Sequence, residues 1–185
     1  MSDDDTFYDD RPLPDEHYIA VGKVCDAWAR LEFDVDHSIR HLLQTPQAMS
    51  ACVTAQIINI HPKLAALQAL CNLFLGKEHA LCAELASFSG RLSGEADKRN
   101  RIVHDRRTIS KKTGRVHRLC ITAKRTLEFK PQEDNLNEIL DFVSKLSSMR
   151  IEFSDLWKRI DAAIERQVSE SPPQFPNIAR GSDSP

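Results

Sequence analysis

The residues with the clearest chemical potential lie in the segment 95–105, which reads E-A-D-K-R-N-R-I-V-H-D. Asn100 and His104 are four residues apart, so on a helix they share one face, and Arg99 lies at the edge of that face. Arginine binds phosphate, an amide orients its neighbours, and imidazole transfers protons near neutral pH. The set predicts metal-free cleavage of RNA, provided that a second copy or a neighbouring helix completes the site.

The same segment also fits a solvated helix face. Pairs of opposite charge recur there at or near i,i+4 spacing, as between Glu95 and Arg99 and between Arg101 and Asp105. Basic residues and histidine near the end of a helix also suit the helix dipole. From spacing alone the solvated face is the more frequent case, because short motifs often match by chance.

A strongly basic segment follows the motif, although the net charge of the chain is only -2. Residues 98–130 hold twelve lysines and arginines against two acidic residues, whereas residues 1–16 are acidic. The basic segment predicts a surface for a polyanion such as RNA, or else a ribbon edge kept soluble by charge. The predicted RNA contacts are Arg101, Arg106, Arg107, Lys111, Lys112 and Arg115.

Helices must position these residues. Apolar residues recur every three or four positions in the ranges 17–43, 77–105 and 132–167, which predicts three long helices. Thr45-Pro46 predicts the start of a further helix that runs to about Ile60, and His61-Pro62 predicts its end. A helical piece from Pro62 to Gly76 completes the set.

Between the last two long helices the apolar period changes from helical to partly alternating. Residues 106–130 contain a Thr113-Gly114 turn, and they predict a β-hairpin. The predicted fold is all-α, an up-and-down bundle of about four long helices with a short β-hairpin inserted before the last one. Residues 17–168 form the predicted domain, between a disordered acidic arm at 1–16 and a disordered tail at 169–185.

The totals exclude several classes of protein. The five cysteines are odd in number and form no C-x-x-C, which indicates reduced thiols in a cytoplasmic protein. The acidic N-terminus lacks a signal peptide, and no apolar run is long enough for a membrane helix. His37 and His41 have helical spacing for two metal ligands, but no third ligand lies near them, so we expect neither a metal nor a cofactor.

On these features the chain resembles the HEPN domain superfamily, whose name stands for higher eukaryotes and prokaryotes nucleotide-binding. The resemblance rests on a helical bundle whose penultimate long helix ends in R-N-x-x-x-H, here Arg99 to His104. It also rests on the flanking I-V-H-D-R and on a β-ribbon before the last helix. The match covers about residues 17–167.

The resemblance implies a metal-independent endoribonuclease, a hydrolase in which a homodimer brings two such motifs together. By position, His104 is the general acid or base, Arg99 holds the scissile phosphate, and Asn100 orients the imidazole or binds phosphate. Glu32 or Asp36 on the first helix is the expected supporting residue. Attack by the 2′-hydroxyl leaves a 2′,3′-cyclic phosphate.

The resemblance also implies partners. Besides RNA and a second copy, we expect an antitoxin or regulatory protein if the chain is a toxin or defence effector. Many members of the superfamily lack catalysis, so the alternative is a non-catalytic helical module that binds a protein or a nucleotide. A third alternative is a structural dimer without a ligand.

Overall fold

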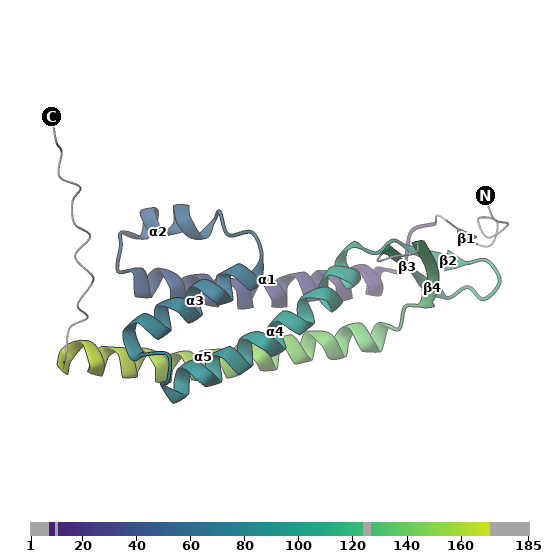
Figure 1. Cartoon of the computed structure of the whole chain (residues 1–185). Coiled ribbons are helices and arrows are strands. Elements are labelled where there is room, and N and C mark those ends of the chain that lie inside the picture. Colours follow the sequence, from purple (N-terminus) through teal and green to yellow (C-terminus); the bar gives the residue numbers. More distant parts are fainter. Residues whose placement is uncertain (1–7, 10, 124–126, 171–185) are drawn as a thin grey trace.

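The computed structural model describes residues 8–9, 11–123 and 127–170, and it consists of five helices and a small sheet (Figure 1). The helices are α1 (Asp15–Leu43), α2 (Gln47–Thr54), α3 (Ile60–Leu75), α4 (Ala80–His104) and α5 (Leu136–Glu170). The strands are β1 (Tyr8–Asp9), β2 (Arg107–Ser110), β3 (Val116–Ala123) and β4 (Leu127–Glu133). The predicted all-α bundle with a β insertion before the last helix is confirmed. The predicted disordered tail at 169–185 lies almost entirely outside the described residues, as does half of the predicted arm at 1–16. The described part of that arm differs from the prediction, because it contains β1 and the first residues of α1.

Ion pairs between the long helices give their relative directions. They are Asp34–Arg150 and His41–Asp161 between α1 and α5, and Glu95–Lys145 and Glu84–Arg159 between α4 and α5. Later residues of α1 meet later residues of α5, so these helices are parallel, whereas α4 is antiparallel to both. Successive helices run in alternating directions when the short α2 is counted. This helix lies over α1 in Figure 1. A bundle of four alternating helices would instead place the first and last antiparallel.

The helix boundaries differ from the prediction around α2 and α3. The second helix ends at Thr54, not near Ile60, and Ile60 is the first residue of α3. Pro62 therefore lies in the first turn of α3. Proline is tolerated there because the first N–H groups of a helix have no partner inside it.

The core forms where the predicted apolar faces meet. Val24, Leu31 and Val35 of α1 are fully buried, as are Leu146 and Ile160 of α5. Burying this surface is the main favourable contribution to folding. Within the described part of the chain, no helix combines the length and apolarity that crossing a membrane requires.

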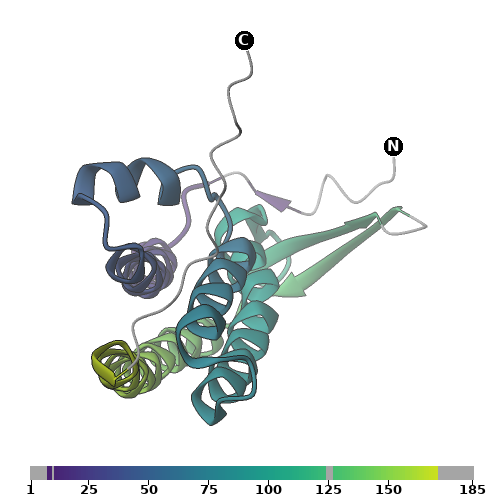
Figure 2. The same ribbon diagram turned by 60° about the vertical axis from the view of Figure 1, so that its left-hand side comes forward.

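The sheet extends from the end of the bundle where α1 begins, α4 ends and α5 begins (Figure 1). Its strands are antiparallel and ordered β1-β2-β3-β4. Figure 2 shows β3 and β4 running outward from the helices as a hairpin. Gly114, with φ of 69°, lies in the turn between β2 and β3, and glycine adopts this left-handed conformation without strain.

Buried charges join the sheet to the helices. Arg107 of β2 lies opposite Arg118 of β3, an arrangement of like charges that is unfavourable on its own. Asp134, between β4 and α5, accepts a 2.6 Å hydrogen bond from Nε of Arg107, and these two side chains are only 3% and 7% exposed. Arg118 lies within 4.0 Å of Asp134 and 3.8 Å of Asp105. Two carboxylates thus balance two guanidinium groups where α4, the sheet and α5 meet.

Candidate functional site

The three motif residues lie in the last two turns of α4. Asn100 and His104 are exposed, and Arg99 is half-buried. His104 is the final residue of the helix, and the backbone N–H of Asp105 closes the last turn on the carbonyl of Arg101. The helical spacing predicted from the sequence is therefore present, with Asn100 and His104 one turn apart on the surface.

Arg99 is held by an aromatic ring from another helix. Its guanidinium carbon lies 5.5 Å from the ring centroid of Trp28 on α1, within the range of a cation–π interaction. Its Nη1 donates a 2.9 Å hydrogen bond to Oδ1 of Asn100. Its Nε is buried and has no hydrogen-bond partner among the described residues. A guanidinium restrained in this way is a pre-organised anion contact, because little freedom remains to be lost when phosphate binds.

His104 and the amide nitrogen of Asn100 remain available to a ligand. No hydrogen bond or ion pair joins the His104 side chain to another described residue. The bond from Arg99 occupies Oδ1 of Asn100 and leaves its NH₂ group as a donor. One chain thus presents a cation, an amide donor and an imidazole on one surface.

The two acidic residues predicted to support this site lie farther along α1. Asp36 accepts a 2.8 Å hydrogen bond from Lys63 of α3, so its charge is already balanced. Glu32 is half-buried and lies one turn beyond Trp28. Because α1 and α4 are antiparallel, this turn leads away from His104, and the helical rise gives an offset of roughly 13 Å along the bundle.

The predicted RNA contacts divide between the surface and the interior. Lys111 and Lys112 are exposed in the β2–β3 turn, and Arg106 is exposed after α4. The Arg107 side chain is 7% exposed and bound to Asp134, so it offers little to an RNA backbone.

Arg101 belongs to a different flank of α4. It is exposed, but it lies two residues after Arg99 and so points to nearly the opposite side of the helix. There it borders a cavity together with Lys98 and Glu138 of α5. Because Arg101 and His104 are three residues apart, they are neighbours on the helix, and a contact of Arg101 with RNA would adjoin His104 on the side away from Arg99.

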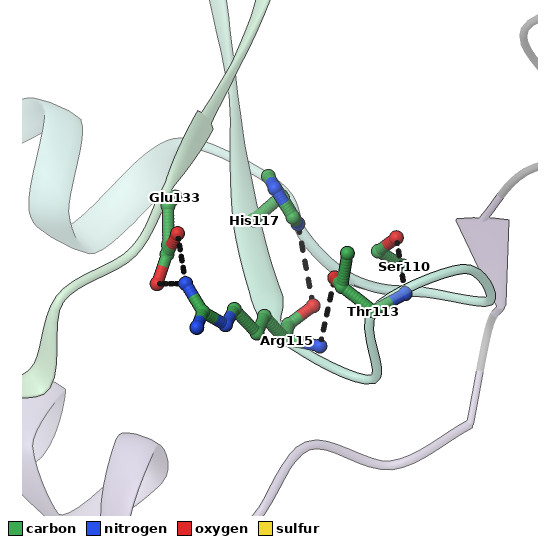
Figure 3. A network of polar contacts seen from close by, with 5 residues as sticks. All are labelled: Ser110, Thr113, Arg115, His117 and Glu133. Atoms are coloured by element: carbon green, nitrogen blue, oxygen red, sulfur yellow. Dashed lines mark hydrogen bonds and ion pairs between the residues drawn. The ribbon is translucent and has the colours of Figure 1, made fainter.

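Arg115 is exposed but paired. Figure 3 shows its guanidinium against Glu133, whose two carboxylate oxygens lie 3.0 Å from Nη1. The same view shows the turn that carries it, where Thr113 accepts from the backbone N–H of Arg115 and donates its own N–H to Ser110. The positive charge of Arg115 is thus partly neutralised within the sheet.

The predicted histidine pair does not form a metal site in the described part of the chain, where no group of three or more potential ligands was found. His41 lies 2.9 Å from Asp161 and edge-on to Trp157. His37 stacks on Phe33 of its own helix. Both histidines therefore have structural neighbours in the folded chain.

Sequence reasoning missed two partners of the site. Trp28 lies in the apolar face of α1, where core packing is the expected role, and it is both buried and placed against Arg99. Asp134 was not singled out, although it balances Arg107 and lies near Arg118. Both contacts join residues far apart in the chain, so no local pattern points to them. Comparisons with protein-family models, with curated proteins and with solved structures found no match.

Proposed function

We propose that this protein is a metal-independent endoribonuclease of the HEPN type that acts as a homodimer. The observation that supports it best is the arrangement at the end of α4. Arg99 is pre-positioned by Trp28, while Asn100 and His104 beside it are exposed. These groups match the needs of phosphodiester cleavage, which are a bound phosphate, stabilised negative charge and a proton carrier.

The reaction begins when the 2′-hydroxyl of the substrate attacks the adjacent phosphorus and gives its proton to the imidazole of His104. A new bond forms between phosphorus and O2′, and the bond to O5′ breaks. The leaving O5′ takes a proton from an acid. Arg99 and the NH₂ group of Asn100 hold the non-bridging oxygens as their charge grows. The products are a 2′,3′-cyclic phosphate and a 5′-hydroxyl.

Two proton carriers serve this reaction better than one, and the motif supplies one histidine per chain. A second copy that brings its own His104 to the same cleft would supply the acid. The homodimer in the proposal follows from this need. Arg106 follows the end of α4, and Lys111 and Lys112 lie in the β2–β3 turn of the sheet that extends from this end of the bundle (Figure 1). All three are exposed, and they would bind the RNA backbone without reading its sequence.

The test is cleavage of RNA by the purified full-length chain in EDTA. We expect wild type to leave 2′,3′-cyclic phosphate ends and to elute as a dimer. His104→Ala should lower the rate by about 100-fold or more, which is typical of losing a general acid or base. Arg99→Ala should lower it as well. The matched control is His61→Ala, which removes an exposed histidine on α3 and should leave cleavage unchanged.

Three results would contradict the proposal. One is cleavage that His104→Ala leaves intact, and another is cleavage that EDTA abolishes. The third is the absence of cleavage on several RNA classes by a folded dimer, which would favour a non-catalytic binding module. If the protein is a toxin, its expression should arrest growth, and His104→Ala should relieve the arrest.

A further inference from the structure

A second cavity lies at the same end of the bundle, and its lining differs from that of the His104 surface. Its volume is about 550 Å³, which is within the usual size of small-molecule sites. The polar lining comes from Arg11, His17, Tyr18 and Arg107, and the apolar wall includes Val21 and Val103. No carboxylate of the described residues lines it. Arg99, Asn100 and His104 are not among its lining residues, so the two surfaces are distinct.

Three nitrogen atoms of this lining are buried and unpaired. His17 is 7% exposed, and neither of its ring nitrogens has a hydrogen-bond partner among the described residues. The Arg107 side chain is also 7% exposed, and while its Nε binds Asp134, its Nη2 has no partner among them. Nη2 of Arg107 is a donor, whereas a neutral imidazole has one donor and one acceptor nitrogen. A buried donor without an acceptor costs free energy, which an incoming acceptor relieves.

The Tyr18 side chain also favours an acceptor. The Tyr18 hydroxyl accepts a 3.2 Å hydrogen bond from the backbone N–H of Leu13, so its own proton is free to donate. The lining thus offers hydrogen-bond donors, among them the guanidinium groups of Arg11 and Arg107, beside an apolar wall. An oxyanion on a small apolar body complements both parts.

We propose that this cavity binds a small organic anion, with its carboxylate or phosphate group at Arg107 and His17 and its apolar part against Val21 and Val103. The three nitrogens are shielded from solvent, and the segment 11–13 lines the cavity beside the first turns of α1. Arg11 and Pro12 in that segment are exposed and form the outer wall. This site does not depend on the proposed ribonuclease activity.

Titration calorimetry and NMR on the full-length chain test the proposal with three probes: benzoate, phenyl phosphate and the neutral benzamide. We expect at least one of the two anions to bind at millimolar concentration or below and to shift the imidazole signals of His17. Benzoate and phenyl phosphate separately report a carboxylate and a phosphate preference. Benzamide should bind much more weakly, because it lacks the negative charge that the Arg107 guanidinium recognises.

Arg107→Lys is the sharpest variant, because lysine keeps a cation beside Asp134 and removes Nη2. It should weaken anion binding by about tenfold or more, as expected when a hydrogen bond to a charged group is lost. The matched control is Arg115→Lys, at an exposed pair on the same sheet, which should leave binding unchanged. His17→Phe, which keeps a ring without donors, should weaken binding similarly and decides the matter if Arg107→Lys does not fold.

Equal binding of benzoate, phenyl phosphate and benzamide would overturn the proposal. So would unaltered anion affinity in folded Arg107→Lys and His17→Phe, or no binding of either anion at millimolar concentration.

Discussion

Asp134→Ala is expected to destabilise the protein severely, although it removes one small side chain outside the helical core. The carboxylate of Asp134 is 3% exposed and holds Arg107, whose side chain is 7% exposed. Without it, Arg107 and Arg118 face each other across β2 and β3 with only Asp105 nearby. A buried charge that loses its partner cannot recover its hydration, so the folded state bears the cost.

The expected loss is about 3–5 kcal/mol of unfolding free energy, the usual cost of breaking a buried ion pair. For a chain of this size it corresponds to a fall of about 10 °C in the melting temperature. The adjacent residue provides a matched control. Glu133 pairs with Arg115, and those side chains are 54% and 66% exposed, so Glu133→Ala should cost only about 0–1 kcal/mol.

Urea unfolding followed by far-UV circular dichroism measures both variants, with the free energies taken by linear extrapolation. The double variant Arg107→Met with Asp134→Leu removes the pair together and should recover about 2 kcal/mol or more of the loss. Losses within about 1 kcal/mol of each other for Asp134→Ala and Glu133→Ala would refute the reasoning. So would a double variant less stable than Asp134→Ala.

Two further expectations concern titratable groups in the helices. Hydrogen bonds from Arg159 and Arg91 lower the pKa of Glu84 and of Glu152 from 4.5, so these pairs between α4 and α5 contribute stability above pH 4.5 and lose it as the pH falls through the lowered values. Urea unfolding between pH 7 and pH 3 should therefore show a smaller loss in Arg91→Gln with Arg159→Gln than in wild type, and an equal loss would contradict this. Burial raises the pKa of Cys71 to about 12, so its thiol is protonated at pH 8, and a thiol reagent should label the exposed Cys52 far faster in the native protein. Equal labelling rates for Cys52 and Cys71 would contradict that assignment.

Local pattern was sufficient to predict the main elements. The helical period along α1 and α5 identified the buried faces that contain Val24, Leu31, Leu146 and Ile160, because a helix in water must bury its apolar stripe. The change of period after His104 predicted the β insertion. The position of Asn100 and His104 on one face of α4 also follows from helix geometry alone.

The helix boundaries near α2 were beyond the reach of such patterns. His61-Pro62 predicted a break, yet Pro62 lies inside the first turn of α3. Proline is unfavourable in the interior of a helix but is compatible with its first turn. The residue type therefore permits either a break at Pro62 or a helix that begins just before it. Where Thr54 ends one helix and Ile60 begins the next depends on how the short α2 folds back over α1.

The order of residues is enough to predict which faces are apolar, where the period changes and which chemically active residues share one helix face. The environments of those residues depend on the folded structure. Trp28 packs against Arg99, Asp134 neutralises Arg107, and Lys63 pairs with Asp36. His17 lines a cavity without a hydrogen-bond partner among the described residues. The reason is physical: periodicity is a property of consecutive residues, whereas the charge and exposure of a side chain depend on neighbours brought from distant parts of the chain.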